Sequence, residues 1–312
     1  MTLRTILSAA LLTTVVACGG ATPQADSADT AEGDGTEALH VIQIHRPLAA
    51  GQRFHVEVEA RQLVQTAEAV DNPDEQVIDG FTKDIQVAFA AAVLIREVDD
   101  AGRAAQAEMT VETFTDPATG NEILAPGTEL VIGWQDDALY VEVNGAAPDA
   151  AAMERLHLAF PLERPGSALG DELFGTDTPR APGETWALHE NDVVEDLGDD
   201  GYTVTETNLE GETRFVEVSP CGDTECIVLE AAFAAEQAVV AQEWQMAEFE
   251  AGRIEALVRI RLPVDAARPV YSEEAMLRGL FAVELHEGDE TRQTLVTLSR
   301  VRNATYSRLP AE

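Results

Sequence analysis

The sequence has very little positive charge. Among 312 residues, 20 are Lys or Arg and 57 are Asp or Glu, and Lys83 is the only lysine. The formal net charge of −37 repels other polyanions, so nucleic acids and anionic membrane surfaces are unfavourable partners. We therefore expect no nucleic-acid partner.

Motifs for the common chemistries are also missing. The six histidines have no paired zinc-ligand spacing, and no Gly-Lys phosphate loop occurs. Gly166-Ser167-Ala168-Leu169-Gly170 lacks the Gly two positions before Ser that a nucleophile elbow needs. Asp196, Asp199 and Asp200 resemble a calcium loop, but Gly198 occupies a ligand position and Thr207 replaces the closing Glu. We predict no catalytic residue, no metal site, no cofactor and no enzymatic activity.

No apolar run beyond the start of the chain approaches the ~20 residues that a membrane-spanning helix needs. The first 17 residues contain one basic residue, Arg4, then an apolar run from Ile6 to Val16 that ends in small residues. A short basic region followed by a short apolar region is typical of an export signal. Residues 1–17 are therefore predicted to be a signal peptide.

The segment Val15-Val16-Ala17-Cys18 resembles the lipobox of bacterial lipoproteins. In that family the thiol corresponding to Cys18 carries diacylglycerol, and the peptide is cut before it. The resemblance implies lipid attachment at Cys18 and a cell-envelope location, because two or more acyl chains hold a protein stably on a membrane. In that family, Asp directly after the lipidated cysteine favours retention in the inner membrane. This chain has Gly19 at that position, so we expect it in the outer membrane of a Gram-negative bacterium. The alternative is an ordinary cleaved signal with an incidental cysteine.

Residues 18–38 are small, polar and acidic, with no aromatic residue. Such a segment buries too little apolar area to offset the entropy of ordering, so we expect a disordered tether. Beyond it, apolar residues alternate with polar ones at period two, the pattern of half-buried strands. In the first half, residues 39–160, this pattern predicts strands over 52–64, 82–98, 103–115, 129–134 and 139–143.

The first half ends in a helix. Met153, Leu156 and Phe160 recur at helical spacing between Asp149 and Pro161, which predicts one amphipathic helix. Residues 161–182 are rich in Pro and Gly and are interpreted as a long connection. The second half, residues 183–312, is predicted to continue as strands over 202–209, 213–218, 226–235, 253–262, 278–286 and 291–306. We expect 253–262 and 278–286 both to pair with 291–306, and residues 236–250 fit either helix or strand.

These patterns predict a mostly β, β-rich α+β fold: a long antiparallel curved sheet or half-barrel in two related halves, with one short capping helix. Phe160-Pro161, which closes the first half, and Gly183 to Trp186, which restart the second, resemble a group of uncharacterised two-part β lipoproteins. Those are in turn similar to the half-barrel periplasmic lipoprotein carriers. The long insertion between Phe160 and Trp186 departs from that layout.

Cys221 and Cys226 are the first and last of six consecutive residues within the segment Ser-Pro-Cys-Gly-Asp-Thr-Glu-Cys. At a hairpin tip this spacing brings the two sulfurs within reach, and an exported chain meets oxidising conditions, so we predict a structural disulfide. The alternative is redox chemistry, which favours Cys-x-x-Cys at a helix start.

Aromatic residues supply the one indication of a binding site. Two interpretations stay open: they fill an ordinary core, or they line a lipid cavity, with small inward residues leaving room. The residues concerned are Phe54, Phe89, Trp134, Phe160, Trp186 and Trp244, and the small ones are Ala91, Ala105 and Ala107. The sequence thus predicts a non-catalytic carrier of an apolar or lipid ligand, anchored to the membrane. The alternative is a cell-surface structural or protein-interaction module with a filled core and an acidic surface.

Overall fold

The computed structural model describes residues 38–68, 82–135, 138–160, 162–199, 201–240, 247–249, 252–287 and 290–309. The predicted signal peptide, Cys18 and all but the last residue of the predicted tether lie outside the described residues. Trp244 also lies outside them.

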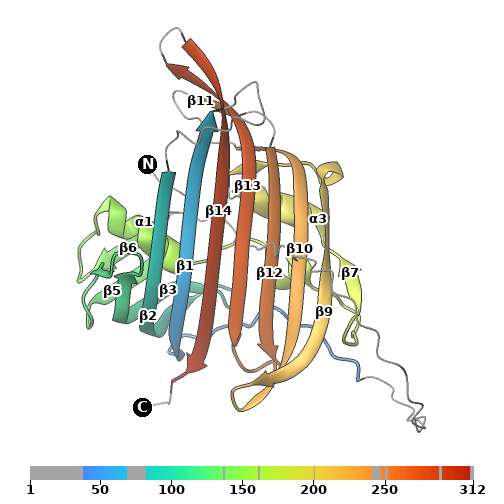
Figure 1. Ribbon diagram of the computed structural model, residues 1–312. Coiled ribbons are helices and arrows are strands. Elements are labelled where there is room, and N and C mark those ends of the chain that lie inside the picture. The colour runs from blue at the N-terminus through green and yellow to red at the C-terminus, as the bar shows by residue number, and fades with distance from the viewer. Residues whose placement is uncertain are drawn as a thin grey trace, which may run out of the picture.

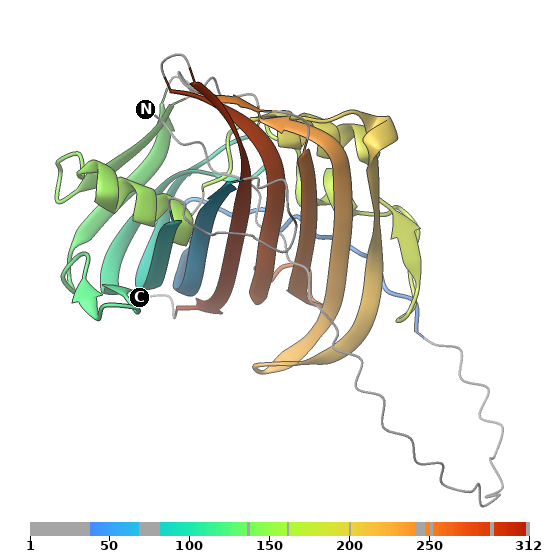
Figure 2. The ribbon, with the colours of Figure 1, turned by 45° about the horizontal axis from the view of Figure 1, so that its top comes forward.

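One antiparallel sheet makes up most of the protein (Figure 1). Its strand order is β6-β5-β3-β2-β1-β14-β13-β12-β10-β9-β7, while β4 pairs with β3, β11 with β13 and β8 with β10. The sheet is open, with β6 and β7 as its outer strands, and it is strongly curved (Figure 2). The mostly β, curved antiparallel architecture predicted from the sequence is confirmed. The strands are β1 (Arg53–Glu68), β2 (Thr82–Val98), β3 (Ala104–Asp116), β4 (Asn121–Glu122), β5 (Glu129–Gln135), β6 (Ala138–Val143), β7 (Thr185–Ala187), β8 (Tyr202–Thr203), β9 (Leu209–Cys221), β10 (Thr224–Val240), β11 (Ala247–Phe249), β12 (Gly252–Pro263), β13 (Ser272–Glu287) and β14 (Glu290–Arg308).

The first and last long strands meet in the middle of this sheet. β1 pairs along its length with β14, from Phe54 opposite Arg308 to Glu68 opposite Thr294. The expected pairing of 253–262 with the final strand is wrong, because β12 pairs with β10 and β13 and so lies one strand away from β14. Sequence alternation specifies which residues face inward, but it does not specify which strand is the neighbour.

The described residues form three α-helices where one was predicted: α1 (Ala150–Ala159), α2 (Gly170–Phe174) and α3 (Glu190–Asp199). α1 is the expected helix, and the Asp149 side chain caps its start by accepting a hydrogen bond from Ala152 N. α2 lies inside the Pro/Gly-rich connection. α3 buries only Val193 and Leu197, one turn apart on an otherwise acidic surface, which is why its helical period was missed. The helices lie behind the sheet in the view of Figure 1, on its concave side.

Two other segments differ from the expected strands. Residues 202–209 form the short β8 followed by a 3₁₀ turn, η1 (Glu206–Asn208). β10 continues to Val240 instead of ending near residue 235, and β11 is also a strand. The described residues between 236 and 250 are therefore strand, without helix.

Two hydrophobic cores cover the concave face. The first core belongs to β1, β2, β3, β5, β6 and α1, and the second to β9, β10, β12, β13, β14, α2 and α3. Between them, along β1 and β14, the inward positions carry the buried polar residues Gln62, Arg300 and Arg302. The fold therefore has two apolar halves separated by a polar strip at its centre.

A disulfide joins Cys221 and Cys226 at the tip of the hairpin between β9 and β10, with the two Cα atoms 5.7 Å apart. Within the described ranges, no helix has the length and apolar character that crossing a membrane requires.

Candidate functional site

A cavity of about 520 Å³ lies on the concave face, between the two cores. Its volume falls within the ~300–1,000 Å³ typical of small-molecule sites. Both halves supply its apolar wall, with Phe54, Ile95, Phe160 and Leu162 from the first core and Ile44, Leu173, Phe174 and Val258 from the second.

The N-terminal strap, residues 39–50, crosses the concave face and forms part of this wall. At one end, His40 exchanges two backbone hydrogen bonds with Arg180, and at the other, Leu48 N donates to Gly102 O at 2.8 Å. In between, the backbone N–H groups of Ile44 and His45 donate to the Asp171 carboxylate at 2.6 and 3.1 Å. The strap is thus held by α2 on one side and by the turn before β3 on the other.

Arg103 closes the turn between β2 and β3 and lines the cavity. Its Nε donates to Asp99 Oδ2 at 2.6 Å, and Nη1 donates to the backbone oxygen of Ser167. Burial acts to raise the pKa of Asp99. Hydrogen bonds from the Arg103 backbone and guanidinium outweigh this effect, so the pKa is lowered. Arg103 therefore carries a charge that Asp99 balances, and it ties the connection containing Ser167 to the first half.

A second arginine, Arg302, lies at the centre of the sheet on β14. Its guanidinium donates to Ala159 O at the end of α1, to Tyr306 Oη on the same strand and to Glu273 Oε2 on β13, at 3.3, 3.2 and 3.3 Å. Burial acts against its charge, but Tyr306 and Glu273 raise the pKa of Arg302 above its usual value. A positive charge at the C-terminus of α1 also matches the helix dipole.

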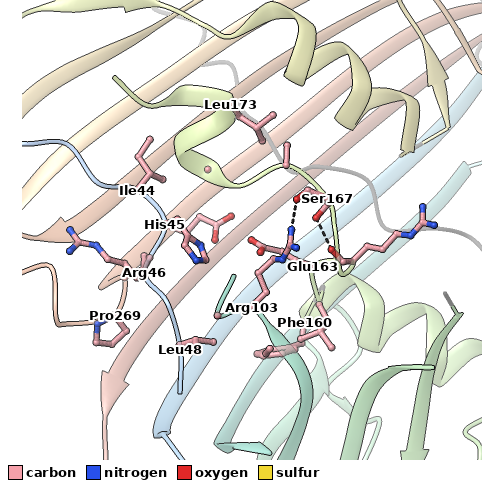
Figure 3. Close-up of a pocket in the computed structure, with 18 of the residues that line it drawn as sticks. Ile44, His45, Arg46, Leu48, Arg103, Phe160, Glu163, Ser167, Leu173 and Pro269 are labelled. Carbon is pink, nitrogen blue, oxygen red and sulfur yellow. Dashed lines mark hydrogen bonds between the residues drawn. The ribbon is translucent and has the colours of Figure 1, made fainter. Parts of the chain in front are cut away.

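Glu163 projects into the cavity from the connection after α1. Figure 3 shows it in the same part of the cavity as His45 of the strap and Arg103. Its side chain is accessible to water through the cavity and yet enclosed by protein on most sides. Burial raises the pKa of Glu163; His45 and Arg103 oppose this rise, and Glu273 and Asp99 add to it. Within the described part of the chain, no hydrogen bond or salt bridge neutralises this carboxylate.

A second carboxylate of the same kind lies on α3. Burial, together with the charges of Asp199 and Glu163, raises the pKa of Asp196 to about 7. Asp196 Oδ2 is buried and has no hydrogen-bond partner among the described residues. The neighbouring Asp199 pairs with Arg164, with 3.6 Å between Oδ1 and Nη1. This side of the cavity therefore has an excess of carboxylates.

Two further basic groups line the cavity without offering a free charge to it. Burial and the charge of Arg300 lower the pKa of His157, which favours its neutral ring. Arg46 of the strap donates from Nη2 to Pro263 O at 3.0 Å, while its Nε and Nη1 are sealed from solvent and have no partner in the described structure. A molecule inside the cavity does not reach those two nitrogens.

Of the aromatic residues named from the sequence, some line the cavity and others fill the cores. Phe54, Trp134 and Phe160 line the cavity, whereas Phe89 and Trp186 belong to the two cores. Of the small inward residues, Ala91 and Ala107 are fully buried in the first core, so they do not supply the cavity's space.

Sequence reasoning missed the polar residues of the cavity. The sequence did contain one signal for Arg302. Its position on the strand has the same parity as those of Val296, Leu298 and Ala304, which places a charged residue on the inward, otherwise apolar face. For Glu163 and Asp196 no comparable signal exists, since one lies in an irregular connection and the other in an acidic run.

The arrangement is suited to holding a molecule with an apolar body and one polar group. Among the described residues, no group of three His, Cys, Asp or Glu side chains is placed to hold a metal ion. No protein-family model matches the sequence, and a search of curated proteins finds no significant match.

Proposed function

We propose that this protein is an exported, lipid-anchored envelope protein that binds or carries an apolar or lipid ligand without catalysing a reaction. The supporting observation is the cavity of about 520 Å³ between the two cores, whose walls are largely apolar. A surface module with a filled core would not require such a space, so the cavity favours the carrier over a purely structural or interaction role.

The energetics of chain burial support the same proposal. Burial contributes about 0.8 kcal/mol per methylene, so a fully enclosed dodecyl chain gains about 9 kcal/mol before the costs of association. Micromolar affinity needs about 8 kcal/mol of net free energy, so a chain of this length or longer, together with one polar contact, reaches a useful range.

The anchor at Cys18 and the outer-membrane location belong to this proposal. Anchoring by two or three acyl chains would keep the cavity near a membrane that supplies lipid. Growth of the host with radiolabelled palmitate tests the anchor, because Cys18→Ser would abolish labelling. A wild-type protein that stays unlabelled would contradict this part of the proposal.

Native mass spectrometry of the protein purified from its own host tests the ligand. We expect a co-purifying lipid at one copy per chain. Ala104→Phe places a bulky ring at a half-buried cavity position and should expel the lipid. The matched variant Ala90→Phe, at a half-buried position outside the cavity lining, should retain it. Equal retention by both variants would show that the lipid binds elsewhere.

A further inference from the structure

The charges that line the cavity do not balance. Arg103 is paired with Asp99, Arg302 with Glu273 and Arg164 with Asp199. After these pairs are set aside, the ionisable lining groups that remain among the described residues are His45, Arg46, His157, Glu163 and Asp196.

The three basic residues of this set are poorly placed to bind an anion. His45 Nε2 donates to Ala101 O at 2.7 Å, and burial and the charge of Arg300 lower the pKa of His157. Arg46 is 8% exposed, and its two unpartnered nitrogens, Nε and Nη1, are closed to solvent behind the strap. By contrast, the side chain of Glu163 is accessible through the cavity. Among the described ionisable lining groups, the accessible one without a hydrogen-bond or salt-bridge partner is therefore Glu163, an acceptor of hydrogen bonds.

Asp196 reinforces this acceptor. It lines the same cavity from α3 and is close enough for its charge to interact with that of Glu163. An anionic head group in this region would meet Glu163 and, as the pH rises through about 7, ionised Asp196 as well, and like charges repel. The overall charge of −37 acts in the same direction.

We propose that the cavity selects amphiphiles whose head group is a cation or hydrogen-bond donor, such as a long-chain primary amine, and that Glu163 binds this head group while the chain lies along the apolar wall. Fatty acids are disfavoured ligands. This inference rests on the proposed carrier function and specifies its ligand class. The apolar wall that would hold the chain is formed by Phe54, Ile95, Leu139, Phe160 and Leu162.

The test compares three probes with the same chain: dodecylamine, dodecanol and dodecanoate. Each is titrated calorimetrically into the purified protein below its micelle-forming concentration, and native mass spectrometry counts the molecules bound. A hydrogen bond to a charged group changes affinity by about tenfold or more. We therefore expect dodecylamine to bind one per chain, at least about tenfold more tightly than dodecanoate, with dodecanol between them.

Glu163→Gln is the diagnostic variant, because it keeps the size of the side chain and removes no native hydrogen bond among the described residues. It should reduce the preference for the amine by about tenfold. Glu59→Gln removes the same charge from an exposed position on β1 and should leave the preference unchanged, which separates local binding from general attraction to an acidic protein.

The outcomes distinguish this inference from the proposed function. Dodecanoate binding as tightly as dodecylamine would overturn the ligand class and leave the carrier function standing. An amine preference that is equal in wild type, Glu163→Gln and the double variant with Asp196→Asn would also overturn it. Binding of none of the three probes would contradict the carrier function itself.

Discussion

Arg302 on the last strand donates a hydrogen bond to the carbonyl oxygen of Ala159, the final residue of α1, across 3.3 Å. Residues 143 positions apart therefore meet at the centre of the concave face, where the helix of the first half ends on a strand next to the second half. The same guanidinium reaches Glu273 on β13, so Arg302 links the two halves beside the cavity.

Replacing Arg302 should destabilise the whole fold. Arg302→Met removes the partner of Glu273 and leaves Ala159 O unpaired in a buried position, at a cost of about 3 kcal/mol. Urea unfolding followed by circular dichroism measures this change. The double variant Arg302→Met/Glu273→Gln should recover part of the loss, because it removes the uncompensated charge. Equal stability of wild type and Arg302→Met would contradict the role of this link.

Ionisation of Asp196 should weaken the fold as pH rises. Its pKa is raised from an ordinary value near 3.8 to about 7, so the folded state binds one more proton than the unfolded state between those values. The stability contributed by the protonated group is complete below about pH 4 and is lost as pH rises to about 7. Asp196→Asn should therefore match wild type near pH 4 and exceed it at pH 8, by up to about 4 kcal/mol.

Urea unfolding at a series of pH values checks this behaviour. Glu195→Gln, an exposed position on the same helix, is the control and should follow the wild-type profile. A parallel offset between Asp196→Asn and wild type at all pH values would contradict the assigned pKa.

The strap should loosen when Asp171 is removed. Asp171→Ala deletes the acceptor for the backbone N–H groups of Ile44 and His45, and hydrogen bonds to a charged group are worth about 1.5–3 kcal/mol each. Hydrogen exchange resolved by residue should become faster at these two amides by tenfold or more. Asp177→Ala, at an exposed position in the same connection, should leave their exchange unchanged. Unaltered protection in Asp171→Ala would show that the strap is held elsewhere.

The disulfide should contribute modestly to stability and nothing to ligand binding. It closes a short loop at a hairpin tip, for which loop-closure entropy predicts about 2 kcal/mol. Cys221→Ser/Cys226→Ser should therefore lower the free energy of unfolding by that amount while its affinity for the preferred amphiphile stays at the wild-type value. Loss of binding in a folded double variant would assign these cysteines a role in the site.

Local patterns in the sequence predicted the elements whose apolar residues follow one clear period. β2 buries alternate residues from Ile85 to Ile95, and α1 combines a capping Asp149 with Leu156 at a helical position. α3 was not predicted, because its two buried apolar residues, Val193 and Leu197, are too few to show a helical period. The sequence therefore predicted where these strands and α1 lie along the chain. It did not predict the order of the strands in the sheet.

The polar part of the cavity depends on that strand order. Arg302, Glu273 and Ala159 meet only because β14 lies between β1 and β13, and alternation does not contain this information. Glu163 and His45 come together through the strap and the connection, two irregular segments whose paths follow from tertiary contacts. The apolar lining, in contrast, was partly predictable from Phe54, Trp134 and Phe160.

Quenching of Trp134 fluorescence by a brominated alkyl chain tests the central claim most directly, because Trp134 lines the cavity. In the wild type we predict saturable quenching at one molecule per chain. The quenching should disappear in Trp134→Phe, and Ala104→Phe should weaken binding by at least tenfold. Quenching that never saturates, or that is as strong in Trp134→Phe as in the wild type, would contradict ligand binding in this cavity.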